Sequence, residues 1–227
     1  MEGCVRAMTG TEGQARKLCI DLCSGLGGFS QAFIDAGWDV VRVDNESKFN
    51  PTVCADITEI DWNEFRISVL GGRTPDLLLA SPPCERFSIA CRTWPKVGIK
   101  KAMQIVGACF EAVGVLRPSY WMIENPMGRL RWFLGKPGQT LRLVDYGAPY
   151  EKKTDLWSNF VLPLVQGRKE AEFWVYKEGH FNAKQAKPEY SPKYSPIALP
   201  GKGKGKALCA LMPYGLSQAI LEAVSQS

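Results

Sequence analysis

The stretch KLCIDLCSGLGGFSQAFIDAGWDVVRVDNE, residues 17–46, decides the fold. An apolar run over 17–23 predicts a short buried strand, and the glycine-rich turn SGLGG ends it. The apolar residues of 29–38 then recur at helical spacing, and a second apolar run over 39–43 predicts a strand that ends at Asp44. A strand, a helix and a strand in this order indicate parallel strands joined by a helix.

The same alternation continues along the chain. Continuous apolar runs predict strands over 76–80 and 119–125, and residues 52–57 form a third strand or its loop. Helical spacing is found over 61–70 and 100–116. Strands that alternate with helices predict an α/β fold, a Rossmann-like, mostly parallel sheet with helices on both faces.

The pattern changes after residue 138. Residues 139–162 read as two extended runs around a turn, which predicts an antiparallel hairpin at the sheet edge. Clear periodicity is then lost, and apolar spacing returns near the C-terminus. We therefore expect four segments: a flexible lead-in at 1–16, a catalytic and cofactor-binding domain at 17–160, a small basic insert at 161–206 and a closing helix at 207–227.

Composition narrows the class of protein. The 227 residues are 45% hydrophobic and 22% charged, as expected for one globular domain. No apolar run approaches the roughly 18 residues of a membrane span, and the first 17 residues lack the apolar region of a secretory signal. We therefore expect a soluble, cytoplasmic protein.

The cysteines and the single histidine limit the chemistry. None of the eight cysteines forms a CxxC pair, so neither a disulfide framework nor a metal site is expected. His180 is the only histidine and lies in a polar stretch, which indicates chemistry that runs without imidazole.

The net charge of +5 is located in one segment. Residues 161–206 hold nine Lys or Arg and four Asp or Glu, and the rest of the chain is balanced. Six aromatic residues lie among these charges. Basic residues interleaved with aromatics favour a nucleic-acid partner, and a solvated lysine-rich flap is the other reading.

The stretch DLLLASPPCERFS, residues 76–88, places a thiol after two prolines at a strand end. Pro82 and Pro83 fix the backbone, so Cys84 stands on a stiff loop at the carboxyl edge of the sheet, where ligands bind. Arg86 and Arg92 nearby would favour the thiolate. A buried structural thiol is the alternative, although it does not explain the prolines.

A second stretch, WMIENP at 121–126, brings Glu124 to the same edge. A carboxyl group at the end of an apolar strand should have a raised pKa and could donate a proton near neutrality; a solvated carboxylate is the alternative.

The glycine-rich turn at 24–28 and Asp44 suit a ligand that contains a ribose, whose hydroxyl groups Asp44 would bind. The alternative is a tight turn and a solvated aspartate without a ligand.

A thiol and a protonatable glutamate suggest one reaction class. A thiolate that adds at C6 of cytosine, while an acid protonates N3, makes C5 able to attack an electrophilic methyl group. A base in a duplex would have to be flipped out to be reached.

These motifs resemble, in order, those of the S-adenosylmethionine-dependent cytosine-C5 DNA methyltransferases, and look most like the short phage-type members. The similarity runs from 17 to 224, through DLCSGLGGF, VRVDNE, CADIT, SPPCERFS, ENP, VDYGAPYEKKTDLW and MPYGLSQAILEAV. It implies a class I methyltransferase fold, S-adenosylmethionine as cofactor, and DNA as partner.

The resemblance also implies site residues. The catalytic set is Cys84 as nucleophile, Glu124 at cytosine N3, and Asn125. The cofactor-binding set is Asp21, Cys23, Gly25, Leu26, Gly27, Gly28, Asp44, Asn45, Asp56, Ile57, Pro82 and Ser217. The substrate-binding set is Pro83, Arg86, Ser88, Arg129, Arg131, Lys152 and Thr154. The basic loop after Cys84, which runs through Arg92, Lys96, Lys100 and Lys101, is implied to close over DNA.

The chain departs from the family pattern at several positions. Pro126 replaces a valine, and Tyr150, Lys152 and Thr154 stand where Gln, Arg and Arg are usual. The loop after Glu124 offers Arg129 and Arg131 as candidates to replace the charge that Thr154 lacks. The recognition segment is short, so sequence specificity would be low or would come from a protein partner.

Three alternatives stay open at this stage. An amino-group methyltransferase would carry an aromatic residue at position 84. A pyrimidine C5 methylase could act on RNA or nucleotides. A catalytically silent nucleic-acid-binding module could retain the fold.

Overall fold

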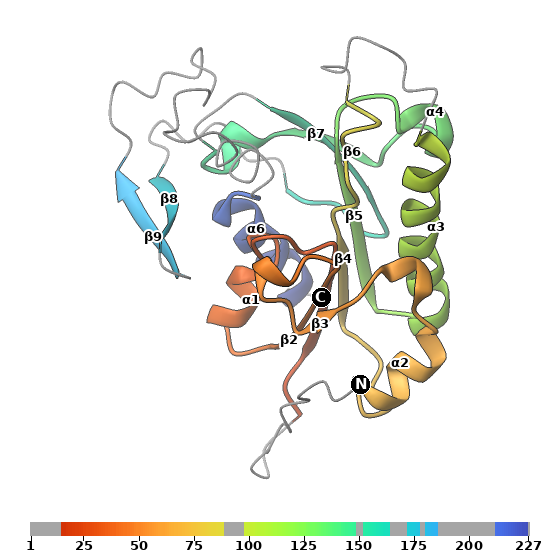
Figure 1. Ribbon diagram of the computed structural model, residues 1–227. Helices are drawn as coiled ribbons and strands as arrows, with labels where there is room; N and C mark the ends of the chain where they lie inside the picture. Colours follow the sequence, from red (N-terminus) through yellow and green to blue (C-terminus); the bar gives the residue numbers. More distant parts are fainter. Residues whose placement is uncertain are drawn as a thin grey trace.

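A seven-stranded sheet forms the middle layer of the protein (Figure 1). The computed structural model describes residues 15–88, 98–148, 152–163, 172–177, 180–185 and 212–226. The sheet order is β3-β2-β1-β4-β5-β7-β6, and β7 alone runs opposite to the other six strands. The strands are β1 (Leu18–Leu22), β2 (Asp39–Asp44), β3 (Val53–Cys54), β4 (Leu77–Ala80), β5 (Tyr120–Pro126), β6 (Gln139–Arg142) and β7 (Lys153–Ser158).

Helices cover both faces of this sheet. On one face, α1 (Gln31–Asp35) packs beside α6 (Tyr214–Ser225), and on the other α2 (Trp62–Ser68) packs beside α3 (Ile99–Leu116) (Figure 1). A one-turn helix, α4 (Arg131–Leu134), follows β5. Short 3-10 helices are also described: η1 (Ser47–Phe49), η2 (Ile57–Glu59) and η3 (Leu143–Tyr146).

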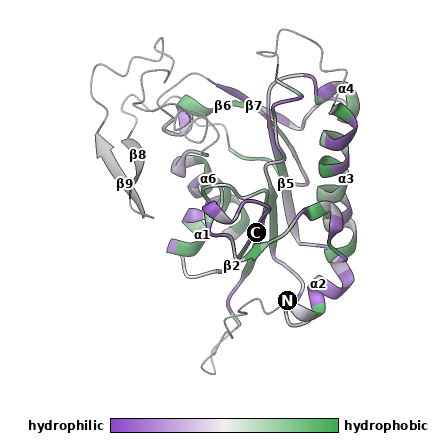
Figure 2. Cartoon of the chain, viewed as in Figure 1, coloured by the Kyte–Doolittle hydropathy of each residue, from purple (hydrophilic) through white to green (hydrophobic). Residues whose placement is uncertain are grey.

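Apolar residues on both faces of the central strands form the core. β1 and β4 are buried along their whole length, as expected for parallel strands covered on two sides. Figure 2 shows the amphipathic pattern of α3, with hydrophobic and hydrophilic residues on different sides. One apolar cluster lies under α1 and α6, and another lies under α2 and α3. The site described below therefore rests on a rigid frame.

Local signals fix where the elements begin and end. The carboxylate of Asp76 accepts the backbone N–H of Leu18 at 2.7 Å, which ties the start of β4 to the start of β1. Asp61 accepts the N–H groups of Asn63 and Glu64 and caps α2. α3 ends at Arg117, which has φ 50° and precedes a proline.

The sequence predicted most of this fold correctly. The α/β class, the parallel strands, the helices on both faces and the antiparallel edge pair of β6 and β7 are confirmed. The helix predicted over 100–116 is confirmed as α3. Lys100 and Lys101, which the resemblance assigned to the loop after Cys84, lie in the first turn of this helix. The four predicted segment boundaries stay predictions, and residues 1–14 and the GKGKGK run at 201–206 lie outside the described ranges.

Residues 161–206, where no periodicity was expected, contain a hairpin. β8 (Glu172–Lys177) pairs antiparallel with β9 (His180–Gln185), and the register pairs Lys177 with His180. Among the helices that are described, none is long and apolar enough to cross a membrane.

Candidate active site

The loop that carries Cys84 leaves the sheet at the carboxyl end of β4. Pro82 is buried, Pro83 is exposed, and the Cys84 side chain is half-buried. The side-chain amide of Asn125 donates to the carbonyl of Pro82 at 2.9 Å. Because Asn125 lies at the end of β5, this bond fastens the cysteine loop to the strand that carries Glu124. The Asn125 Oδ1 atom is buried without a hydrogen-bond partner.

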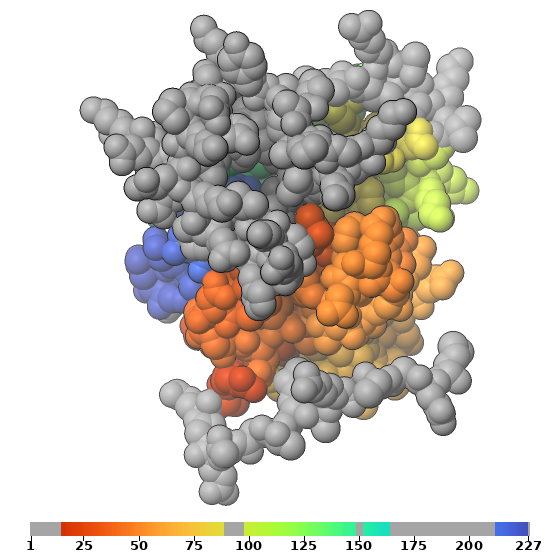
Figure 3. Space-filling view, turned by 60° about the vertical axis from the view of Figure 1, so that its left-hand side comes forward, coloured from red at the N-terminus to blue at the C-terminus, as the bar shows by residue number. Residues whose placement is uncertain are grey.

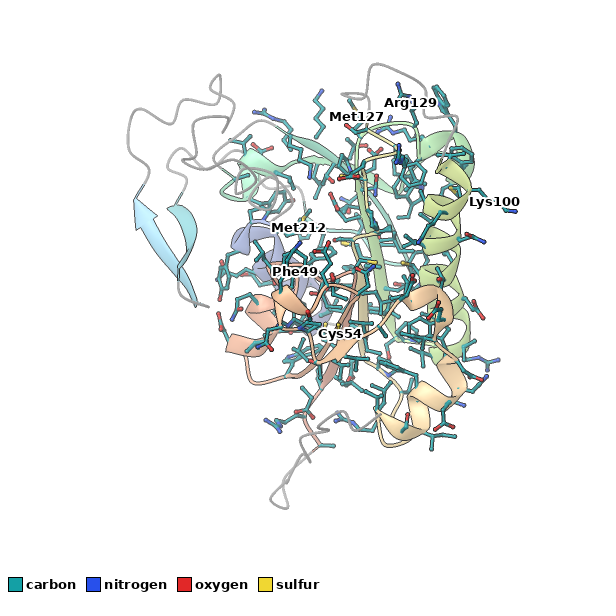
Figure 4. All side chains as sticks on the ribbon, viewed as in Figure 1. Phe49, Cys54, Lys100, Met127, Arg129 and Met212 are labelled. Atoms are coloured by element: carbon teal, nitrogen blue, oxygen red, sulfur yellow. The ribbon has the colours of Figure 1, made fainter. Side chains whose placement is uncertain are left out.

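The far side of the same loop is anchored by Phe87. Its side chain is fully buried, and its N–H donates to the carbonyl of Cys84 at 2.9 Å, which closes a turn. The Phe87 carbonyl accepts the N–H of Arg129 at 2.8 Å, and the Arg129 guanidinium donates to the carbonyl of Ser88 at 2.9 Å. An isolated antiparallel β-bridge pairs the backbone of Ser88 with that of Gly128. Cys84 is thus held between one attachment to β5 itself and one to the segment that follows β5. Met127 and Arg129 of that segment lie together in Figure 4.

Glu124 is buried on the strand next to this loop. The hydroxyl of Thr154 on β7 bonds to Oε1 of Glu124, and Nζ of Lys152 lies 4.0 Å from the same oxygen. Burial raises the pKa of Glu124, while Lys152 and the Thr154 hydroxyl lower it. The predicted rise is confirmed, so Glu124 is suited to hold a proton.

Cys84 differs from what the sequence predicted. Burial raises the pKa of the thiol, and Glu124 raises it further, whereas Lys152 is the main group that lowers it. The expectation that neighbouring arginines make Cys84 a thiolate is therefore wrong for Arg86, which is exposed and contributes no resolved effect. Arg92 lies outside the described residues.

Arg131 does not replace the missing arginine of the family pattern. Its guanidinium makes two bonds to the carboxylate of Asp155, at 2.6 and 2.5 Å, and Asp155 is fully buried. Asp155 and Thr154 are successive residues of β7, so their side chains point to opposite faces of the sheet. Arg131 is held on the face away from Thr154 and Glu124, and Tyr150 lies outside the described residues.

The glycine-rich turn after β1 contains buried polar groups. The hydroxyl of Ser30 donates to Oδ2 of Asp21 at 2.6 Å, while Oδ1 has no hydrogen-bond partner. Burial raises the pKa of Asp21 to about 7. The turn needs a left-handed backbone at Gly25 and Gly27, with φ of 49° and 79°, and Cys23 also adopts φ 54°.

Asp44 supports this turn from the end of β2. Its Oδ2 accepts the N–H of Gly25 at 2.8 Å, and its Oδ1 accepts the N–H of Glu46 at 2.9 Å. The side chain of Asp44 is buried, whereas Asn45 and Glu46 are exposed. Both Asp44 oxygens are thus already engaged with the backbone, and Glu46 is the exposed carboxylate at this strand end.

The other predicted cofactor residues lie on neighbouring segments. Asp56 caps η2 by accepting from the N–H and hydroxyl of Thr58, and these bonds lower its pKa. The hydroxyl of Ser217 on α6 accepts the N–H of Ala32 at 3.1 Å and donates to the carbonyl of Phe29 at 2.9 Å. In Figure 3 the described C-terminal residues, in blue, lie beside residues of the N-terminal part of the chain, in orange. Ser217 therefore connects α6 to the backbone that follows the glycine-rich turn.

The residues around the turn fit a small polar ligand. Oδ1 of Asp21 and the hydroxyl of Ser24 are buried and unpaired, and a Cβ built on Gly25 would meet no heavy atom within 4 Å. Leu26 is half-buried, and Gly28 and Ile57 are buried. Among the described side chains, no group of three His, Cys, Asp or Glu could hold a metal ion.

The fold and this site define an α/β protein of the class I methyltransferase type, with a thiol and a buried acid at one edge of the sheet. Residues 18–130 match the family model described as C-5 cytosine-specific DNA methylase. Over these residues the chain belongs to that family.

Known methyltransferases are similar to part of this chain. The Type II methyltransferase M.XorII of Xanthomonas oryzae is 30% identical over 61% of this chain and 39% of its own length. M.HgiGI of Herpetosiphon aurantiacus is 35% identical over 31% of this chain and 62% of its own length. A crystal structure of a candidate DNA modification methyltransferase from an E. coli prophage aligns at 21% identity and TM-score 0.48, over 63% of this chain and 46% of that one. The chain thus spans less than two thirds of these relatives.

Proposed function

We propose that this chain transfers a methyl group from S-adenosylmethionine to C5 of cytosine in DNA. The observation that carries the proposal is the attachment of the Cys84 loop to the strand of Glu124, through the 2.9 Å bond from Asn125 to Pro82. This bond holds a nucleophile and a buried acid at one edge of the sheet, and the matched family acts on cytosine C5.

Each residue has a defined part in the proposed reaction. The sulfur of Cys84 forms a bond to C6 of a flipped cytosine, and Glu124 gives its proton to N3, so that C5 gains nucleophilic character. The cofactor supplies the electrophilic methyl group. The C5 proton is then removed by a base, the Cys84 sulfur leaves C6, and the N3 proton returns to Glu124. The raised pKa of Glu124 supports its role as donor.

The glycine-rich turn is the proposed cofactor site. Asp21 and Ser24 offer unpaired polar atoms, and the open space before Gly25 allows a ligand to approach the backbone. We assign the contact with the ribose hydroxyls to Glu46, because both oxygens of Asp44 already accept backbone N–H groups. Asp44 would act by holding the turn in place.

The proposed DNA contacts come from the loop after Cys84 and the segment after β5. Pro83 and Arg86 are exposed, and Ser88 and Arg129 are joined by a hydrogen bond. We also propose that a protein partner directs the chain to its target sequence and that the protein acts in the cytoplasm.

The test is transfer of a labelled methyl group to double-stranded DNA, single-stranded DNA and RNA, followed by nucleoside analysis. The proposal predicts 5-methylcytosine in a DNA substrate. Label in RNA alone would identify a different substrate, and label at N4 of cytosine or N6 of adenine would contradict the proposed chemistry. Transfer by Cys84→Ser at a rate near that of the wild type would contradict the mechanism.

A further inference from the structure

One lysine lies beside the buried acid of the site. Glu124 on β5 lies directly opposite Leu156 on β7, so these two side chains point to the same face. Side chains alternate along β7, so Thr154 points to that face as well. Lys152 immediately precedes β7, and its contact with Glu124 places its ammonium on the same face. Lys153 lies between Lys152 and Thr154 in sequence and is exposed.

Lys152 is well placed to act on both reacting groups. Its ammonium lies 4.0 Å from Oε1 of Glu124; the Lys152 side chain is 20% exposed and the Glu124 side chain is 4% exposed. It is also the charge that most favours the Cys84 thiolate. Thr154 binds the same Glu124 oxygen but adds no charge. In the described residues, no other ion pair to Glu124 is found.

Other charged groups nearby do not alter this arrangement. Glu85 follows Cys84 in its loop and raises the pKa of the thiol weakly. Asp155 raises the pKa of Glu124, but Arg131 pairs with it on the opposite face. Arg129 donates to a backbone carbonyl of the cysteine loop.

We propose that Lys152 is a positioning residue whose single positive charge is shared by Cys84 and Glu124, so that the site favours one negative charge at a time. Two neighbouring acids that face one cation titrate as a coupled pair. When Cys84 is a thiolate, Glu124 keeps its proton, and this is the combination that addition to cytosine requires. The site thus links formation of the nucleophile to retention of the acid. This inference deepens the proposed function and rests on it.

The test measures Cys84 directly, without DNA. Alkylation by iodoacetamide is followed at Cys84 by peptide mass spectrometry as a function of pH. In Lys152→Met the pH midpoint should rise by about one unit or more, because the main favourable charge is lost. In Glu124→Gln the midpoint should fall, because the competing negative charge is lost.

Lys153→Met is the matched control. It removes the same charge one residue away, from an exposed side chain on the other face, and should leave the midpoint unchanged. In methyl transfer, Lys152→Met should lower kcat by about 10²-fold, Lys152→Arg should restore most of it, and Lys153→Met should stay within about twofold. Thermal melting shows whether each variant is folded.

Two results would overturn the proposal: an unchanged Cys84 midpoint in folded Lys152→Met, or equal effects of Lys152→Met and Lys153→Met. If Lys152→Met does not fold, a Glu124→Gln midpoint that fails to fall overturns it instead. If the wild type methylates no nucleic acid, the proposed function fails, and the alkylation midpoints still decide whether Cys84 and Glu124 share the charge of Lys152.

Discussion

Replacing Gly128 by alanine should displace the loop that carries the nucleophile. A Cβ at this position would lie 2.4 Å from the carbonyl oxygen of Phe87, and real Cβ atoms essentially never approach closer than 3.0 Å. The difference, 3.0 − 2.4 = 0.6 Å, is the smallest shift that relieves the clash, and both partners are backbone. Because Cys84 is three residues before Phe87, the shift reaches the nucleophile.

The expected effects on catalysis and on stability are of similar size in free energy. Overpacking of this kind costs about 1–3 kcal/mol, and a misplacement near 1 Å at a reacting group can cost about 10²-fold in rate. We therefore expect Gly128→Ala to lower kcat for methyl transfer by about 10- to 10²-fold, while affinity for S-adenosylmethionine by calorimetry is kept. The control is Gly107→Ala within α3, where an added Cβ meets nothing within 4 Å and should stabilise the helix by about 0.5–1 kcal/mol. A Gly128→Ala enzyme with wild-type kcat would refute the argument that this contact positions Cys84.

The other predictions concern buried charges and the cofactor. Burial raises the pKa of Asp21 to about 7, so the folded state keeps a proton that the unfolded chain loses near pH 4. The free energy of unfolding should therefore fall by up to about 4 kcal/mol between pH 4 and 7. Urea denaturation of Asp21→Asn should not show this loss. Arg131→Met leaves the buried Asp155 without its ion pair and should lower the free energy of unfolding by about 3 kcal/mol in urea, with a change below about 1 kcal/mol contradicting the pairing. Glu46→Gln should weaken S-adenosylmethionine binding by about tenfold in calorimetry with an unchanged melting temperature, whereas Asp44→Asn should lower the melting temperature; the reverse pattern would return the ribose contact to Asp44.

The sheet was predictable because its signals are local. The apolar runs predicted as strands are β1, β4 and β5, and most of their residues are buried. A strand that is covered on both faces has a continuous apolar run in its sequence, which can be recognised without the structure. The edge pair of β6 and β7 was also predicted, although its place in the sheet order depends on pairing that no local pattern specifies.

The hairpin of β8 and β9 had a signal that was overlooked. EFWVYK and HFNAKQ are short runs with aromatic residues, joined by only Glu178 and Gly179. A two-residue link with glycine between such runs indicates a hairpin. The pattern was missed because residues 161–206 were judged as one segment, whose many Pro, Gly and Lys residues show no periodicity.

The site residues were harder to predict because their roles depend on tertiary contacts. Sequence proximity suggested that Arg86 would act on Cys84, yet Lys152, 68 positions away, is the favourable charge there. Arg131 was a reasonable substitute for the missing arginine until its pairing with Asp155 placed it on the other face. The engagement of Asp44 by two backbone N–H groups is likewise visible only in three dimensions.

A covalent adduct with DNA that contains 5-fluorocytosine tests the central claim most directly. Fluorine at C5 cannot be removed as a proton, so the bond between the Cys84 sulfur and C6 should persist after methyl transfer. The account predicts an adduct that peptide mass spectrometry locates at Cys84, that requires S-adenosylmethionine, and that is lost in Cys84→Ser. Methylation of ordinary cytosine at C5 by an enzyme that never forms this adduct, or an adduct at another cysteine, would contradict it.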